Sequence, residues 1–66
     1  MRVRVNGEWR EFPGEISIET LLVQLHLDSA LVAAEVNLAV VPRAERAGRV
    51  LRDGDQVELV SFVGGG

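Results

Sequence analysis

The stretch Met1–Phe12, MRVRVNGEWREF, decides the fold. Its first half alternates valine with arginine, which predicts a strand that has one apolar and one polar face. Asn6-Gly7 follows, and this pair is typical of a type I′ hairpin turn, because both central positions of that turn need positive φ. We therefore expect residues 1–6 and 8–12 to form a β-hairpin.

The loop length of this hairpin decides where Trp9 lies. A two-residue turn pairs Val5 with Glu8 and places Trp9 on the polar face, against Arg4. A three-residue bulged loop turns Trp9 toward the core instead. The sequence leaves two alternatives open: a tryptophan that packs in or over the sheet, or an exposed tryptophan on Arg4 that anchors a partner.

A helix is predicted over residues 18–26. Ser17 can accept a hydrogen bond from a free backbone N–H at the helix start, and Glu19 in the first turn complements the helix dipole. Apolar residues recur at i, i+3, i+4 and i+7, so one face can pack on a sheet. His26 has no cysteine, serine nucleophile or carboxylate pair beside it, and we expect a surface residue there, not a base or metal ligand.

The second half of the chain predicts three further strands, separated by turns. The expected elements are a strand over 31–37, a turn at 38–39, a short strand at 40–41, a polar segment with a helical turn at 43–49, a turn at 52–55 and a strand over 56–63. One helix across a mixed sheet of about five strands is a two-layer α+β arrangement. We expect the first hairpin to lie beside the last strand, as in the β-grasp, or ubiquitin-like, fold.

Composition limits what this chain of 66 residues can be. It has no cysteine, so it can form neither a disulfide nor a cysteine zinc site. The net charge is −3 and all seven basic residues are arginine, which argues against nucleic-acid binding. There is no long apolar run and no signal sequence, so we expect no membrane association and a cytoplasmic location.

The last three residues, Gly64-Gly65-Gly66, are the main functional clue. We expect a domain over 1–63 followed by this flexible tail, which carries an unhindered α-carboxylate roughly 10 Å from the domain when extended. Such a tail suits delivery of a reactive group into the active site of another protein. The alternative is a frayed chain end or a linker without function.

The last strand is apolar on both faces. Val57 and Leu59 alternate with Glu58, Val60 and Phe62. If the first pair faces the helix, the other three form an exposed, largely apolar surface that leads to the glycines, and we expect a partner interface there. The alternative is that the helix or a loop covers this face.

Two other candidates are assigned to structure. Arg43, which follows a proline, is expected to be a solvated arginine. Asp53 and Asp55 lack the ligand spacing of a calcium loop, and Asp-Gly pairs are ordinary turn formers. We therefore expect a turn at residues 52–55 and no metal site.

Several short motifs follow one another along the second half of the chain. They are Val36-Asn37, Val41-Pro42-Arg43, Leu51, Asp53-Gly54-Asp55, Val57-Glu58 and the terminal Gly65-Gly66. Taken in this order, they resemble the ThiS family of bacterial sulfur carriers in thiamine biosynthesis. The resemblance covers nearly the whole chain. Leu38 departs from it, because the family often has glycine after the asparagine.

The resemblance implies a carrier and not an enzyme. In the family, ATP activates the C-terminal glycine as an acyl-adenylate on a ThiF-like adenylyltransferase. Sulfur from a cysteine desulfurase or another donor then replaces AMP, and the thiocarboxylate supplies a ThiG-like thiazole synthase. Carried onto this chain, Gly66 is the modified residue, and Gly64 and Gly65 thread into the partner. ATP and magnesium belong to the activating enzyme, so this chain binds no cofactor.

Three other functions share the predicted fold. A MoaD-like small subunit of molybdopterin synthase would carry the same thiocarboxylate to a pterin precursor. A ubiquitin-like modifier would form isopeptides through the same tail. A nucleic-acid-binding β-grasp module is disfavoured by the acidic balance of the chain. The sequence does not determine the sulfur acceptor, and the oligomeric state is likewise open.

Overall fold

The structure, a computed structural model, describes residues 1–62. Its N-terminal hairpin adopts the two-residue turn: φ is 49° at Asn6 and 83° at Gly7, and Val5 lies opposite Glu8. The two strands are β1 (Arg2–Val5) and β2 (Glu8–Glu11). The hairpin is therefore confirmed, and its register places the polar side chains of β1 on the face away from the core.

The described chain forms a five-stranded mixed sheet with the order β2-β1-β5-β3-β4. β1 pairs with β5 in parallel, and the other neighbours are antiparallel. The remaining elements are α1 (Ile18–Gln24), the 3₁₀ turn η1 (Ser29–Leu31), β3 (Val32–Val36), β4 (Ala39–Val40), the 3₁₀ turn η2 (Arg43–Glu45) and β5 (Gln56–Ser61). This arrangement confirms the predicted β-grasp fold.

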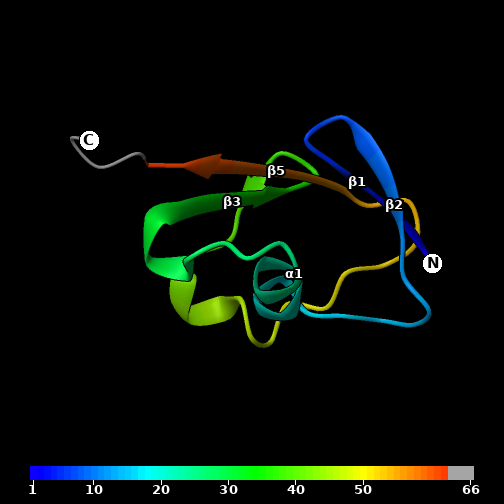
Figure 1. Cartoon of the computed structure of the whole chain (residues 1–66), viewed down its shortest axis with the longest axis horizontal. Coiled ribbons are helices and arrows are strands. Elements are labelled where there is room, and N and C mark those ends of the chain that lie inside the picture. Colours follow the sequence, from blue (N-terminus) through cyan, green and yellow to red (C-terminus); the bar gives the residue numbers. More distant parts are fainter. Residues whose placement is uncertain (63–66) are drawn as a thin grey trace.

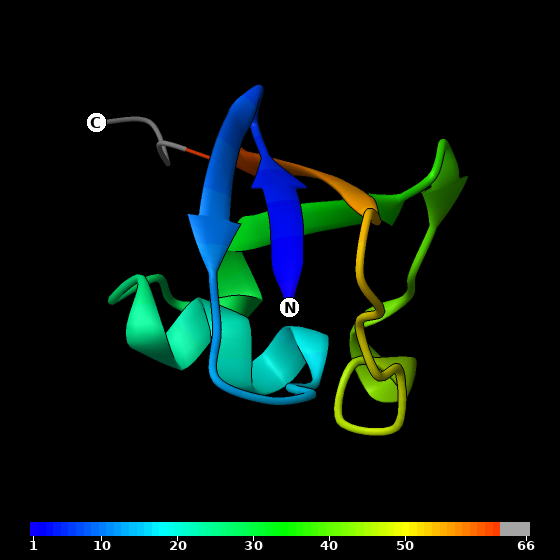
Figure 2. The ribbon, with the colours of Figure 1, turned by 90° about the vertical axis from the view of Figure 1, so that its right-hand side faces the viewer.

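Within residues 1–62, helical elements cover one face of the sheet. In Figures 1 and 2, α1 and the segment that contains η2 lie on the same side of the strands, and no described helix lies on the opposite face. Side chains between the two layers form the core. The core residues are Val3, Val5, Ile18, Leu21, Leu22, Val32, Ala34, Val36, Val41, Leu51, Val57 and Leu59. We call the uncovered side the outer face of the sheet.

The start of α1 is capped from two directions. The Oγ of Ser17 accepts the backbone N–H of Thr20 at 3.1 Å, as the sequence predicts. The carbonyls of Arg49 and Arg46 accept the first two N–H groups of the helix at 3.0 and 3.3 Å. The segment after η2 thus supplies acceptors that the helix itself lacks.

The end of α1 corrects the expected range. The helix stops at Gln24, and His26 lies beyond its C-cap with a φ of 59° instead of in the last turn. The N–H of His26 donates to the carbonyl of Val23, and that of Leu27 donates to the carbonyl of Leu22. These bonds are the Schellman ending, which needs one left-handed residue to reverse the chain.

The turn after β3 is also displaced by one residue from the expected position. Asn37 and Leu38 occupy it, with φ of 51° and 71°, and Ala39 already pairs with Val36 in β4. Positive φ at both positions matches a two-residue type I′ turn. The chain therefore keeps this turn although Leu38 replaces the glycine that suits it best.

Arg46 departs most from its predicted environment. The segment over 43–49 contains the expected helical turn, but the side chain of Arg46 is only 5% exposed. Its guanidinium donates to the carbonyl and the Oγ of Ser29 at 2.8 and 3.0 Å, and to the carbonyl of Val32 at 2.6 Å. The carbonyl of Val41 accepts a longer bond of 3.5 Å. The buried guanidinium thus donates its hydrogen bonds to uncharged oxygens.

Candidate functional site

The two faces of β5 have different environments. Val57 and Leu59 are buried against the helix layer, whereas Val60 and Phe62 are 57% and 58% exposed on the outer face. Glu58 is exposed on that face as well. The predicted alternation is therefore confirmed, and α1 lies on the opposite side of the sheet from the outer face (Figure 1).

The end of β5 is held by side-chain and backbone hydrogen bonds. The carboxamide of Asn6 donates to the carbonyl of Leu59 at 3.1 Å and accepts its N–H at 2.7 Å, so it continues the ladder where β1 turns away. The N–H of Phe62 donates to the carbonyl of Leu31 at 2.6 Å. The strand is thus fixed up to the last described residue. The glycines Gly64, Gly65 and Gly66, with their predicted roles, lie outside the described residues.

The outer face also contains residues that sequence reasoning missed. Glu35 lies directly opposite Glu58 in the antiparallel pair β3–β5, and Val40 of β4 lies opposite Glu35. Ala33 lies opposite Val60 in the same register. Alternation already places Glu35 on the outer side of its strand. Its neighbour on β5 follows only from the pairing of two strands that are distant in sequence.

Trp9 takes the exposed alternative. It lies opposite Arg4 in the hairpin register and is 50% exposed. The guanidinium carbon of Arg2 lies 4.4 Å from the centre of the indole ring, and that of Arg4 lies 5.9 Å away. Both distances are within the range of cation–π attraction. Trp9 is therefore an outer-face residue on β2, held by arginines of β1.

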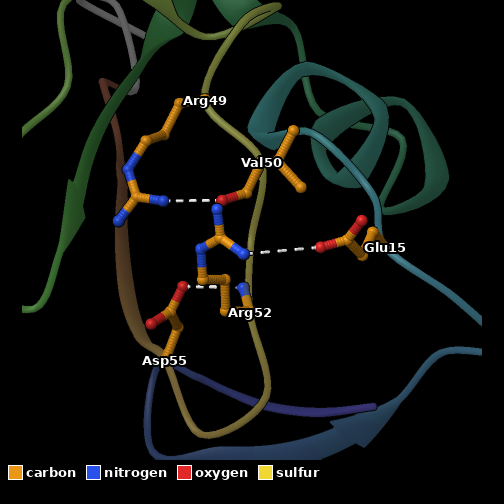
Figure 3. A network of polar contacts seen from close by, with 5 residues as sticks. All are labelled: Glu15, Arg49, Val50, Arg52 and Asp55. Atoms are coloured by element: carbon orange, nitrogen blue, oxygen red, sulfur yellow. Dashed lines mark hydrogen bonds and ion pairs between the residues drawn. The ribbon is translucent and has the colours of Figure 1, made fainter.

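The acidic turn after residue 51 is structural, as expected. Figure 3 shows its contacts: the backbone N–H of Arg52 donates to Asp55 at 2.8 Å, and the guanidinium of Arg52 lies 3.7 Å from the carboxylate of Glu15. Asp53 accepts the N–H of Arg2 at 2.7 Å. Among residues 1–62, no group of three or more His, Cys, Asp or Glu side chains could hold a metal ion.

One surface hollow of the described chain measures about 370 Å³ and is lined by Ser17, Glu19, Thr20, Val23 and Ala47, beside α1. Another is lined by Arg2, Trp9, Asp53 and Gly54. In the described part of the chain, no helix is long and apolar enough to cross a membrane. Arg43 is exposed, in agreement with its expected solvated position. Exposed apolar side chains of the outer face lie at Val40, Val60 and Phe62.

Comparisons with known proteins agree with one another. The sequence model of the ThiS family matches residues 3–66. The chain is 44% identical, over all of its residues, to a segment of a thiazole synthase from Paramagnetospirillum magneticum. It is 30% identical to the sulfur carrier protein ThiS of Escherichia coli, with both chains covered completely.

Solved structures agree with these sequence relations. A crystal structure of a thiamine biosynthesis protein (ThiS) from Geobacter metallireducens superimposes with a TM-score of 0.85 at 32% identity, and each chain covers the other completely. The relatives differ in length, however. The chain spans 20% of the thiazole synthase from P. magneticum and 20% of a second one from Magnetococcus marinus.

Proposed function

This chain belongs to the ThiS family, and from that premise we propose that it is a sulfur carrier in thiamine biosynthesis whose Gly66 carries the sulfur. The observation that supports this most is the family match, which extends over residues 3–66 and so includes the glycines. The chain acts as a co-substrate of other enzymes and not as a catalyst. ATP and magnesium are bound by its activating partner.

The proposed chemistry has two steps at the Gly66 carboxyl group. One carboxylate oxygen attacks the α-phosphorus of ATP, which forms the acyl-adenylate and releases pyrophosphate. A sulfur nucleophile then attacks the carbonyl carbon, and AMP leaves. Sulfide gives the thiocarboxylate directly; a persulfide from a cysteine desulfurase gives an acyl disulfide, which a thiol cleaves to the thiocarboxylate while it is itself oxidised to a disulfide. Adenylation is needed because oxide is a poor leaving group, and a glycine carbonyl offers no side chain to block attack.

Docking has to offset the entropy that the tail loses. Ordering Gly64, Gly65 and Gly66 costs roughly 1–2 kcal/mol per residue. We propose that two exposed side chains, Val60 in β5 and Phe62 just after it, supply compensating contacts to a ThiF-like adenylyltransferase. Their strand leads directly toward the glycines, so contact there also sets where the tail enters.

A ThiG-like thiazole synthase is the proposed sulfur acceptor. Proteins named thiazole synthase contain a segment that this whole chain resembles, at 44% and 39% identity. A carrier segment and a thiazole synthase in one polypeptide favour transfer between the two, because a link raises the effective concentration of one for the other. We propose the same transfer from this chain to a thiazole synthase.

The test is sulfur loading, detected by alkylation and intact mass. The chain is incubated with the adenylyltransferase of its own organism, ATP, magnesium and a sulfide donor, and is then treated with iodoacetamide. The chain has no cysteine, so a thiocarboxylate is its one strongly nucleophilic sulfur. We expect one adduct per chain, and fragmentation should place it on Gly66. Alkylation is needed because oxidation of Met1 gives nearly the same mass change as exchange of oxygen for sulfur.

A chain that lacks Gly65 and Gly66 is the matched control and should gain no adduct. Absence of the adduct from the full chain, in a reaction where the enzyme exchanges pyrophosphate with ATP, would contradict the carrier proposal. Loaded chain is then offered to thiazole synthase or to a molybdopterin synthase large subunit. We expect thiazole formation only, and transfer to the pterin precursor would redirect the proposal to a MoaD-like carrier.

A further inference from the structure

The outer face holds a pair of like charges in direct opposition. Glu35 on β3 and Glu58 on β5 are paired residues of an antiparallel ladder. Side chains in such a pair lie on one face, with Cβ atoms about 4.5–5.5 Å apart, and like charges there are destabilising. The ion pairs found within residues 1–62 involve two other acids, Glu8 and Glu15. Neither Glu35 nor Glu58 belongs to these ion pairs, and the arginines of β1 on the same face, Arg2 and Arg4, lie over the ring of Trp9.

Apolar side chains border this pair on both sides. Val40 lies opposite Glu35 on the edge strand β4 and is 70% exposed. Val60 follows two residues after Glu58 on the same face, and Phe62 follows Val60. Two carboxylates between exposed apolar groups match a ligand that has a cationic head and an aliphatic stem. Arginine and lysine side chains have that form.

We propose that Glu35 and Glu58 together receive a basic side chain, best an arginine, from the adenylyltransferase that acts on Gly66; this rests on the proposed function. Charge complementarity identifies the occupant, since the chain has a net charge of −3 and this face presents two adjacent carboxylates. A planar guanidinium can donate to both carboxylates at once. The contact orients the sheet on the enzyme, while Val60 and Phe62 supply apolar contact.

The test compares the double variant Glu35→Gln/Glu58→Gln with the native chain. We expect its Kd for the adenylyltransferase, measured by calorimetry, to rise about tenfold or more, as for loss of a charge-assisted contact. The dependence of Kd on salt should flatten. At the same time the thermal midpoint of the double variant should rise, because the repulsion between paired strands is removed. A purely structural pair would change stability without changing binding.

Glu45→Gln is the control for loss of a negative charge on another surface. Glu45 lies in η2, on the helix side of the sheet (Figure 1), and its replacement should leave Kd unchanged. Equal affinity of the double variant and the native chain would overturn the inference. It would be overturned as well if magnesium or calcium bound the pair, or if sedimentation showed a dimer that the double variant abolishes. Loading of the native chain with sulfur is a separate readout, so the proposed function can stand while this inference fails.

Discussion

At the scale of the residue, two asparagines act as both turn formers and strand partners. Asn6 and Asn37 each have a φ near 50°, which asparagine tolerates better than most residues. The carboxamide of Asn6 bonds Leu59 in both directions, and that of Asn37 accepts the N–H of Gln56 and donates to Asp55. Both turns are thereby tied to β5 or to the residue before it, and the strand is fixed at its two ends.

Leu38 lacks such compensation, and its replacement should stabilise the chain. Its φ is 71° and its side chain is 89% exposed, so little packing offsets the left-handed backbone. We expect Leu38→Gly to raise the free energy of unfolding by about 1 kcal/mol, measured by urea denaturation. Gly7→Leu, at the matching position of the first turn, should lower it by a similar amount. A decrease for Leu38→Gly would show that the exposed leucine makes contacts of its own.

At the scale of the element, alternate residues of β5 face two different environments. Its inward side chains complete the core, and its outward ones remain exposed. Period-2 geometry allows this, since neighbouring side chains point to opposite faces. Substitutions on the inward face should therefore change the stability of the fold, and substitutions on the outward face should change binding to a partner.

Phe62→Ala tests this separation. We expect it to weaken binding to the adenylyltransferase by about 2 kcal/mol, roughly thirtyfold in Kd, with little change in the unfolding midpoint. Leu59→Ala, on the buried face, should instead destabilise the fold by about 2–4 kcal/mol. Val23→Ala on α1 removes an equally exposed apolar side chain and should affect neither property. Loss of folding in Phe62→Ala would reject the assignment of Phe62 to an interface.

At the scale of the whole molecule, Arg46 connects three separate parts of the chain by hydrogen bonds. Its guanidinium reaches η1 at Ser29 and the first residue of β3, and its own carbonyl caps α1. A domain this small buries only about 60% of its unfolded surface, so single connections of this kind carry much of its stability.

Removal of that guanidinium should be costly. Arg46→Met preserves the apolar stem but leaves buried carbonyls without donors, and we expect a loss of about 2–4 kcal/mol in the free energy of unfolding. Arg46→Lys, which retains the charge with fewer donors, should lose less. Arg43→Met removes an exposed arginine from the same segment and should be nearly neutral. Denaturant titration measures all three, and a neutral Arg46→Met would show that water replaces the guanidinium.

Most elements of the fold, and the candidate site residues in and just after β5, could be predicted from the local sequence pattern. The hairpin at Asn6-Gly7, the cap at Ser17 and the two faces of β5 each depend on residues a few positions apart. Steric limits on φ and the periodicities of strand and helix act over such distances. The exposed side chains Val60 and Phe62 were predictable for this reason, once one face of their strand was assigned to the core.

The tertiary structure alone decided which distant residues meet. It placed Glu35 opposite Glu58 and buried Arg46 among the carbonyls of other segments. Each of these pairings joins segments far apart in the sequence, and no local propensity favours one partner over another. They arise only when the sheet closes over α1, because burial of the shared core selects one register among many.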